Sequence, residues 1–336
     1  MNVSANLSVV QNAPGYNSWS FVQELGGSLV CAYSRGREHS ITESCRGAFA
    51  RRSDDGGQSW LPETTVVNSD TECECAAGKG LDEDGAMLLW VRCAKADGSR
   101  RHDLYRSPDG RSFERLASPA LDPSPMQVLD IHFVPGVGLM SLWFAGEYRD
   151  LPENSWGMLV SRDNGRSWKQ IPVETELRRD DWPTEPSCIV LPDGRIFAIS
   201  RIDNFGGDIP HNCQFQLQSE DSGKTWRKFR TNIDDVNLST PSLLFDSASG
   251  VVSNYYFHRG TGFLKRRSAL LEAVWDNPGA WPEPDVICQA SALFQHAGNV
   301  NTCRFKERHA CTVYSGTERQ TDILLALTDA PARPRR

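Results

Sequence analysis

The chain repeats one short pattern of apolar and polar positions along its length. An apolar run of strand length is followed by a polar turn that contains glycine, and then by a second apolar run that ends in a small or polar residue. Paired runs of this length around Gly-Gly, Asp-Gly, Pro-Gly or Ser-Gly are typical of β-hairpins. The pattern predicts six hairpins, at 18–34, 76–91, 128–145, 186–200, 241–257 and 300–315.

A second motif, Ser-x-Asp-x-Gly-x-Ser/Thr-Trp, recurs between these hairpins. Its copies lie at 53–60, 161–168 and 219–226, with a shorter copy at 107–113 and an eroded one at 276–281. In such a turn the Asp carboxylate accepts backbone N–H groups, Gly supplies a positive φ and Trp anchors the next strand. We therefore expect structural roles for three aspartates, Asp55, Asp163 and Asp221.

The spacing of this motif predicts a repeat architecture. Successive copies lie 54 to 58 residues apart. A unit of about 55 residues holds four short strands, so the chain accommodates six units. The predicted fold class is all-β, a six-bladed β-propeller that forms a single domain over 1–336. Segments 6–10 and 323–327 are predicted to pair in the last blade and to close the ring.

Composition narrows the class of protein. Hydrophobic residues make up 39% of the chain and charged residues 24%, as in an ordinary globular protein. No run approaches the ~18 apolar residues of a membrane span. The first residues lack the pattern of a signal peptide, so we expect a cytoplasmic protein, or a secreted one if a leader has been removed. The net charge of −7 disfavours a nucleic-acid partner.

The ten cysteines are expected to be reduced and mostly buried, since no secretory signal is visible. Cys73 and Cys75 form the one close pair. Neither a Cys-x-x-Cys nor a His pair with zinc spacing accompanies them, so we expect no metal site.

In a propeller, the ends of the inner strands converge on a central funnel. Polar residues at the predicted strand ends are therefore candidates for a site: Asn17, Ser18, Arg35, Asp130, Glu185, Arg201, Thr240, Asn301 and Tyr314. We expect Trp182, His258 and Arg259 to form walls of the same pocket.

The turn motifs are similar to the Asp boxes of the sialidase (neuraminidase) superfamily, and two further segments strengthen the resemblance. Segment 184–201 resembles the one in which a Glu opens an inner strand and an Arg ends the next strand. Segment 312–316 resembles the one that carries the nucleophilic Tyr. The resemblance spans essentially the whole chain. It implies an exo-acting, retaining glycoside hydrolase that acts on a glycan or glycoconjugate and needs no cofactor; it does not indicate an oligomeric state.

The resemblance implies that Tyr314 is the nucleophile and Glu185 its base. A sialic acid carries a carboxylate on its anomeric carbon, which would repel an anionic nucleophile by ~4 kcal/mol at 4 Å and an effective dielectric near 20. A neutral Tyr avoids this repulsion. Because its pKa lies near 10, a neighbouring carboxylate has to take the proton.

The substrate carboxylate suits arginine, whose planar fork binds it through two hydrogen bonds. The resemblance assigns this role to Arg201 and Arg267, with Arg266 as the alternative in a register shifted by one residue. Arg35 matches a further family arginine. The first family arginine has no counterpart at 17–20, and Arg37 is a candidate for a replacement charge. With two arginines, a related ulosonic acid or a uronic acid also suits the site.

The acid/base residue of the family also has no direct counterpart at the matching position of this chain. Where the family has an Asp, this chain has Ile41 and Thr42. Glu43 is the nearest carboxylate and the expected acid/base, with Glu38 and His39 as competitors. Asp130 is expected either to bind a sugar hydroxyl or amide or to join neighbouring blades.

Two other functions fit the same residues. The first is a propeller exo-glycosidase for neutral sugars, similar to an arabinanase, in which Glu185 is a nucleophile or acid and Tyr314 only a wall. The second is a non-catalytic propeller that binds glycans.

Overall fold

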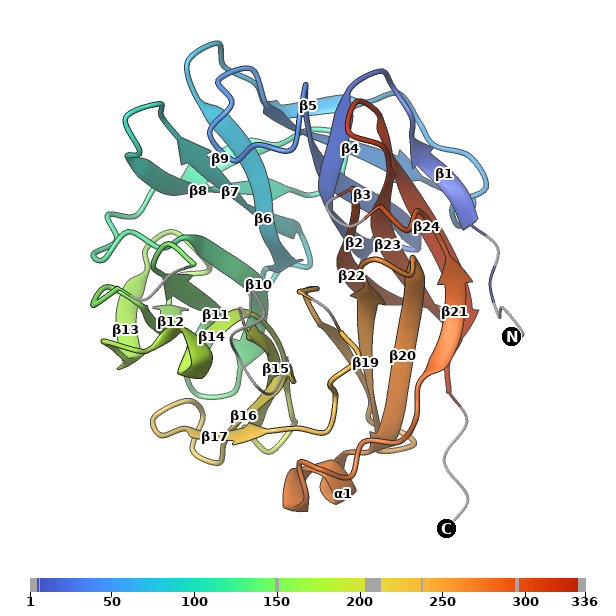
Figure 1. Ribbon diagram of the computed structural model, residues 1–336. Coiled ribbons are helices and arrows are strands. Elements are labelled where there is room, and N and C mark those ends of the chain that lie inside the picture. Colours follow the sequence, from blue (N-terminus) through green and yellow to red (C-terminus); the bar gives the residue numbers. More distant parts are fainter. Residues whose placement is uncertain are drawn as a thin grey trace.

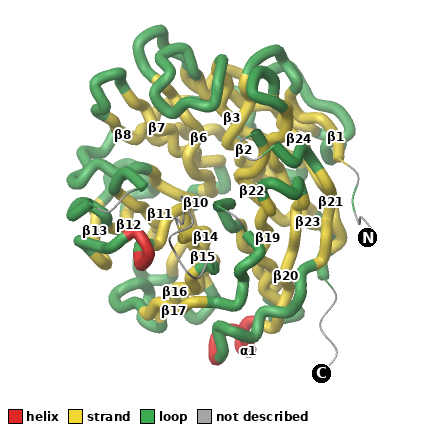
Figure 2. Tube along the Cα trace, viewed as in Figure 1, coloured by secondary structure: helices red, strands yellow, loops and turns green. Residues whose placement is uncertain are grey.

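The chain folds almost entirely into antiparallel β-strands (Figures 1 and 2). The computed structural model describes residue 5 and residues 7–148, 151–202, 213–236, 238–293 and 296–331. Within this part of the chain, the one α-helix is the short α1 (Leu271–Asp276), and a 3-10 turn spans Arg179–Asp181. None of the described helices is long and apolar enough to span a membrane.

Four separate sheets have four strands each, joined in sequence order. The first contains β6 (Cys73–Leu81), β7 (Met87–Ala94), β8 (Arg100–Ser107) and β9 (Glu114–Ala117). The second contains β10 (Gln127–Val134), β11 (Gly138–Ala145), β12 (Ser155–Ser161) and β13 (Lys169–Glu174). The third contains β14 (Pro183–Val190), β15 (Ile196–Ile202), β16 (Phe215–Ser219) and β17 (Arg227–Arg230). The fourth contains β18 (Ser242–Asp246), β19 (Val251–His258), β20 (Phe263–Leu270) and β21 (Asp285–Gln289).

The remaining eight strands form one sheet rather than two separate ones. They are β1 (Leu7–Gln11), β2 (Tyr16–Leu25), β3 (Ser28–Gly36), β4 (Gly47–Ser53), β5 (Thr64–Val67), β22 (Ala297–Phe305), β23 (Arg308–Gly316) and β24 (Thr321–Asp329). One parallel pair, Tyr16 with Thr321, joins β2 to β24. The sequence predicts six separate sheets. In the structure, two of these groups of four strands are merged into one sheet by this bridge.

The two ends of the chain pair as the sequence predicts. Leu7 lies opposite Ala326, and the antiparallel pairing of β1 with β24 continues to Gln11 opposite Ile323. Asn6, which the prediction also included, lies outside the described residues. Because β1 covers the edge of β24, this edge is not left free to pair with another chain.

The sheets surround a common centre (Figure 1). Their first strands contact one another in a closed ring that runs β2, β6, β10, β14, β18, β22 and back to β2. Asp130 on β10 helps to join this ring, since its Oδ1 accepts the Lys79 N–H of β6 at 2.9 Å and its Oδ2 accepts Asn301 Nδ2 of β22 at 3.1 Å. The ring brings strand ends from distant parts of the sequence together.

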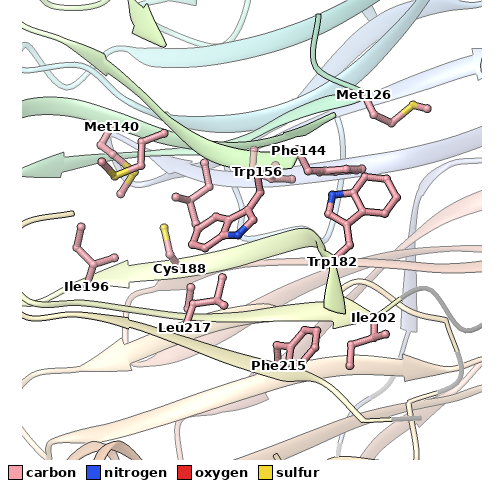
Figure 3. Close-up of a cluster of buried hydrophobic side chains, with 14 of the residues drawn as sticks. Met126, Met140, Phe144, Trp156, Trp182, Cys188, Ile196, Ile202, Phe215 and Leu217 are labelled. Atoms are coloured by element: carbon pink, nitrogen blue, oxygen red, sulfur yellow. The ribbon is translucent and has the colours of Figure 1, made fainter. Parts of the chain in front are cut away.

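Apolar side chains fill the space between neighbouring sheets. Figure 3 shows the cluster between the β10–β13 and β14–β17 sheets, with Trp156, Phe215 and Leu217 among its members. Trp182 belongs to this core, because it is fully buried and its ring meets Phe144 edge-on at 5.7 Å. The prediction that Trp182 lines the pocket is therefore wrong: its large apolar ring is buried between sheets. All ten cysteines are free, as expected, and all but Cys45 are buried.

The recurring turns share one set of hydrogen bonds. In the third sequence copy, Asp163 Oδ1 accepts the Ser161 hydroxyl at 2.8 Å and the Ser167 N–H at 2.8 Å, while Oδ2 accepts the Ser167 hydroxyl at 2.6 Å. Asp55 and Asp221 make the equivalent bonds in their own turns. The hydrogen bonds from Ser167 lower the pKa of the Asp163 carboxyl to about 2.

We expect Asp163→Ala to lower the midpoint of thermal unfolding and to leave any catalytic activity per folded molecule unchanged. The substitution removes the acceptor of three hydrogen bonds in a turn on the second sheet, so stability alone depends on it. Differential scanning calorimetry checks the shift, and Asp70→Ala, at an exposed loop position, is the control. An unchanged midpoint would show that the turn does not depend on this carboxylate.

Two buried histidines make stability depend on pH. His102 is fully buried and His309 is 4% exposed. Burial, together with nearby arginines, lowers the pKa of His309 to about 4 and lowers that of His102 well below its ordinary 6.5. Both groups bind a proton more readily in the unfolded chain, so their contribution is complete above about pH 6.5 and is lost as the pH falls toward 4.

We expect the free energy of unfolding to fall between pH 6.5 and pH 5, by up to about 1.4 kcal/mol per pH unit for each of these histidines. Urea denaturation at pH 7, 6 and 5 measures it. In His309→Gln the slope is expected to be shallower. An equal slope in this variant would contradict the assignment.

Candidate functional site

A cavity of about 430 Å³ opens where the inner strands begin, and it draws its walls from several sheets. Its lining includes the two aromatic residues Trp19 and Tyr148, His39, and the charged residues Arg92, Glu185, Arg201 and Arg259. Glu185 is the one carboxylate among the described lining residues. The cavity is therefore cationic around a single acid.

Three of the lining residues occupy equivalent places in their sheets. Trp19 on β2, Glu185 on β14 and Asn299 on β22 have positive φ values of 49°, 48° and 47°. Each lies where the strand pairing shifts register, so the extra residue of a bulge points a side chain into the cavity. A positive φ is costly for residues other than glycine and is found preferentially at functional sites.

Glu185 and Arg201 form an ion pair on the cavity wall. Arg201 Nη1 lies 2.8 Å from Glu185 Oε2, and the Tyr148 hydroxyl donates to Oε1 at 3.3 Å. Thr184, the neighbour of Glu185, pairs with Arg201 across β14 and β15, which sets the two side chains beside each other. The structure thus brings together two residues that the sequence singled out.

Tyr314 lies on β23 in the place that Arg201 takes on β15. It pairs with Gly298, the neighbour of Asn299, as Arg201 pairs with Thr184, the neighbour of Glu185. Its side chain is fully buried, 6.1 Å from the Tyr16 ring between centroids. Burial raises the pKa of the Tyr314 phenol, and the charge of Glu185 raises it further. The charge of Arg259, a hydrogen bond with Tyr16 and the charge of Arg201 each lower this pKa. The phenol is therefore a neutral group within the electrostatic reach of Glu185 and both arginines.

Arg259 is the second guanidinium beside this group. It follows β19 directly, is 9% exposed, lines the cavity and donates from Nη2 to Asn299 Oδ1 at 3.3 Å. The sequence placed Arg259 on a pocket wall but gave it no role. The signal that would have found it is its position at the end of a second strand, as for Arg201 on β15 and Tyr314 on β23.

The structure corrects the placement of Arg267. This side chain is 3% exposed and bonds to Tyr256 Oη at 2.8 Å, the Pro282 carbonyl at 2.7 Å and Asp235 Oδ1 at 2.9 Å. It lies in the middle of β20, opposite Asn254, where strand alternation turns it into the sheet packing. Arg266, the alternative, pairs with Asp285 at 3.1 Å. Neither side chain belongs to the described cavity lining, and both pair with carboxylates elsewhere.

Arg35 and Arg37 are also bound elsewhere. Arg35 pairs with Glu63 at 3.0 Å and lies over the Phe49 ring, with 4.4 Å between Cζ and the centroid. Arg37 is largely exposed and pairs with Glu43 at 3.0 Å. Neither belongs to the described cavity lining. Both arginines lie near the end of β3, as the sequence suggested, but their side chains pair with Glu63 and Glu43.

Glu43 is arranged as a hydrogen-bond acceptor rather than as an acid. Its carboxylate accepts the Arg37 N–H at 2.9 Å and the Cys45 thiol at 3.0 Å, and Arg46 lies 3.5 Å away. Burial alone would raise the pKa of this carboxyl, but the hydrogen bonds from Cys45 and Arg37 outweigh it and lower the pKa. The prediction of Glu43 as acid/base therefore lacks support from the geometry.

Asp130 is not among the described lining residues of the main cavity. It lines a second cavity of about 40 Å³ together with Glu185 and Asn301. Its carboxylate is occupied by Lys79 and Asn301. Of the two roles that the sequence left open, the joining of inner strands is the one that these bonds serve.

No protein-family model and no curated protein matches the chain by sequence. Solved structures match it by shape. A protein of unknown function from Dyadobacter fermentans superposes with a TM-score of 0.73 at 17% identity, over 96% of this chain and 99% of that one. The NanB sialidase from Streptococcus pneumoniae gives a TM-score of 0.72 at 10% identity, over 97% and 71%. The Trypanosoma rangeli sialidase in complex with 2,3-difluorosialic acid, a covalent intermediate, gives 0.66 at 12% identity, over 93% and 54%.

These identities establish the fold alone. The chain has an all-β propeller fold similar to that of sialidases, as the sequence predicted. It spans about half the length of the trypanosomal sialidase, so what that protein does as a whole is not carried over with the fold.

Proposed function

We propose that the chain is a glycoside hydrolase of sialidase type, which cleaves a terminal acidic sugar, a sialic acid or a related ulosonic acid, by an exo-acting and retaining mechanism. The observation that carries the proposal is that Glu185, Arg201 and Arg259 line one cavity, with the Tyr314 phenol buried within electrostatic reach of all three. The likeness to sialidase folds supports it. We also propose that the eight-stranded sheet comprises two of six blades and that the recurring turns are Asp boxes.

In the proposed reaction, Arg201 and Arg259 bind the carboxylate of the sugar. Tyr314 Oη forms a bond to the anomeric carbon as the bond to the leaving oxygen breaks; the phenol proton passes to Glu185, and the leaving oxygen takes a proton from solvent or departs as an anion. Water then attacks the anomeric carbon and gives one proton to solvent, while the tyrosyl oxygen leaves and takes its proton back from Glu185. Two displacements at the same carbon retain its configuration.

The test is release of aglycone from 4-nitrophenyl N-acetylneuraminide, with a 4-nitrophenyl glycoside of a neutral sugar as comparison. We expect turnover of the acidic substrate alone. Turnover of the neutral glycoside that survives Tyr314→Phe would instead favour the arabinanase-like alternative.

We expect Glu43→Gln to change kcat on this aryl substrate by less than about threefold, because Glu43 is held as an acceptor by Arg37 and Cys45. Steady-state kinetics measure it, with Glu38→Gln as the matched variant on the same loop. A loss near 100-fold, confined to Glu43→Gln, would restore Glu43 as the acid/base.

One observation favours a non-catalytic glycan-binding propeller as the second candidate. Tyr314 is fully buried, so a sugar reaches its oxygen only after neighbouring side chains move. Binding of sialyllactose in calorimetry, with no turnover of any aryl or natural glycoside, would favour this function.

A further inference from the structure

Arg92 is a buried cation that pairs with none of the described carboxylates. It lies on β7, is 6% exposed and lines the cavity. Its Nη1 donates to the Ile41 carbonyl at 2.9 Å, whereas Nε finds no hydrogen-bond partner among the described residues. No described Asp or Glu pairs with it, in contrast to Arg46 and Arg201, which pair with Glu43 and Glu185.

Such an arrangement is unfavourable unless an anion completes it. A buried charge loses its hydration, and the loss is offset only by a partner of opposite charge or by hydrogen bonds. Nε is enclosed by the protein and does not meet a ligand unless its neighbours move. With Nη1 used by Ile41, the Nη2 amino group remains, and its charged N–H donors suit an oxygen of a carboxylate, sulfate or phosphate.

Arg92 lies apart from the arginines of the proposed reaction. It belongs to the β6–β9 sheet, and the β10–β13 sheet separates it from the β14–β17 sheet that carries Arg201 (Figure 1). Both arginines line the same cavity. Across β6 and β7, Arg92 pairs with Cys75, which also lines the cavity, and the small residues Ala76 and Ala77 leave room beside it.

We propose that Arg92 is a second oxyanion-binding residue and that the natural ligand is an acidic glycan with a further sulfate, phosphate or carboxylate besides the one bound at Arg201 and Arg259. The choice of an acidic glycan rests on the proposed function. The oxyanion site at Arg92 does not, because it follows from the burial and the missing partner of this side chain.

The oxyanion site is tested first with inorganic sulfate and with acetate, in a thermal-unfolding assay. Sulfate or acetate at millimolar concentration is expected to raise the unfolding midpoint of the wild-type chain more than that of Arg92→Gln, and Arg92→Lys is expected to keep part of the shift. Arg115→Gln, at an exposed position of the same sheet, is the control and is expected to behave as wild type. In low salt, Arg92→Gln is expected to unfold no earlier than the wild type, since no ion pair is lost. Equal shifts in all variants would overturn the proposal.

The ligand is tested by calorimetry with three probes: N-acetylneuraminic acid, its 2→8-linked dimer and a sulfated form of the monomer. At least one of the two dianionic probes is expected to bind the wild type about tenfold more tightly than the monomer, and Arg92→Gln is expected to abolish this preference. A loss that is equal for all three probes would instead place Arg92 on the sugar's own carboxylate and overturn the proposal, as would the absence of any preference. Because these readouts measure binding, a chain that binds the dianionic probes through Arg92 but turns over no glycoside would refute the proposed reaction alone.

Discussion

Replacing Tyr314 by phenylalanine is expected to lower kcat/KM on 4-nitrophenyl N-acetylneuraminide by at least about 10³-fold. The substitution removes one oxygen and keeps the buried ring, so the packing of Tyr314 against Tyr16 survives. Glu185→Gln is expected to lower kcat by about 10² to 10⁴-fold, the usual contribution of a positioned base. Both losses follow if the phenol attacks and the carboxylate takes its proton.

The controls separate chemistry from folding. Tyr255→Phe removes a buried hydroxyl that bonds to His309 at 2.8 Å, away from the cavity lining, and is expected to leave kcat/KM within about threefold. Glu63→Gln removes a carboxylate that pairs with Arg35 and serves the same purpose for Glu185. Full activity in Tyr314→Phe, measured in stopped or continuous assays, would refute the proposed nucleophile.

Replacing Asp235 by alanine is expected to lower the free energy of unfolding by about 3 kcal/mol, because it leaves Arg267 as an unpaired buried charge. Asp235 accepts hydrogen bonds from Arg267 at 2.9 Å, Lys265 at 2.7 Å and the Tyr256 hydroxyl at 2.9 Å. Burial would raise the pKa of this carboxyl, but these three donors outweigh it and lower the pKa to about 2. Its contribution is thus complete above its ordinary pKa near 4 and is lost as the pH falls toward 2.

Urea denaturation at pH 7 measures this loss, and an exposed ion pair supplies the control. Glu220 pairs with Arg227 and both side chains are more than half exposed, at 61% and 56%, so Glu220→Ala is expected to cost little. Similar losses in the two variants would show that the Asp235 cluster adds nothing beyond an exposed ion pair.

The repeated turns carried most of the fold prediction, because each turn depends on residues within one short segment. Asp55, Asp163 and Asp221 each accept hydrogen bonds within their own turn, so the sequence motif alone contains the residues that form the turn. The joining of β2 to β24 was not visible in the sequence. It rests on the backbone pair of Tyr16 with Thr321 and on two buried hydrogen bonds between Asn17 and Thr321, residues that lie far apart in the sequence.

The candidate site was predictable where a residue lies at a strand end. Glu185 and Arg201 were chosen by position on two paired strands, and they form an ion pair of 2.8 Å. Arg267 was chosen from the family resemblance, in a register uncertain by one residue, but it lies within β20, where alternation decides which face of the sheet a side chain takes. Glu43 and Arg37 lie on a loop whose own hydrogen bonds, invisible in the sequence, hold them to each other.

The most direct test of the central claim is mass spectrometry of the chain after reaction with 2,3-difluorosialic acid. We expect one added glycosyl group on the peptide that contains Tyr314, and no addition in Tyr314→Phe or in wild-type chain blocked by excess N-acetylneuraminic acid. An adduct on Glu185, or one that persists in Tyr314→Phe, would contradict the claim that the buried phenol, served by Glu185 and held beside Arg201 and Arg259, is the nucleophile.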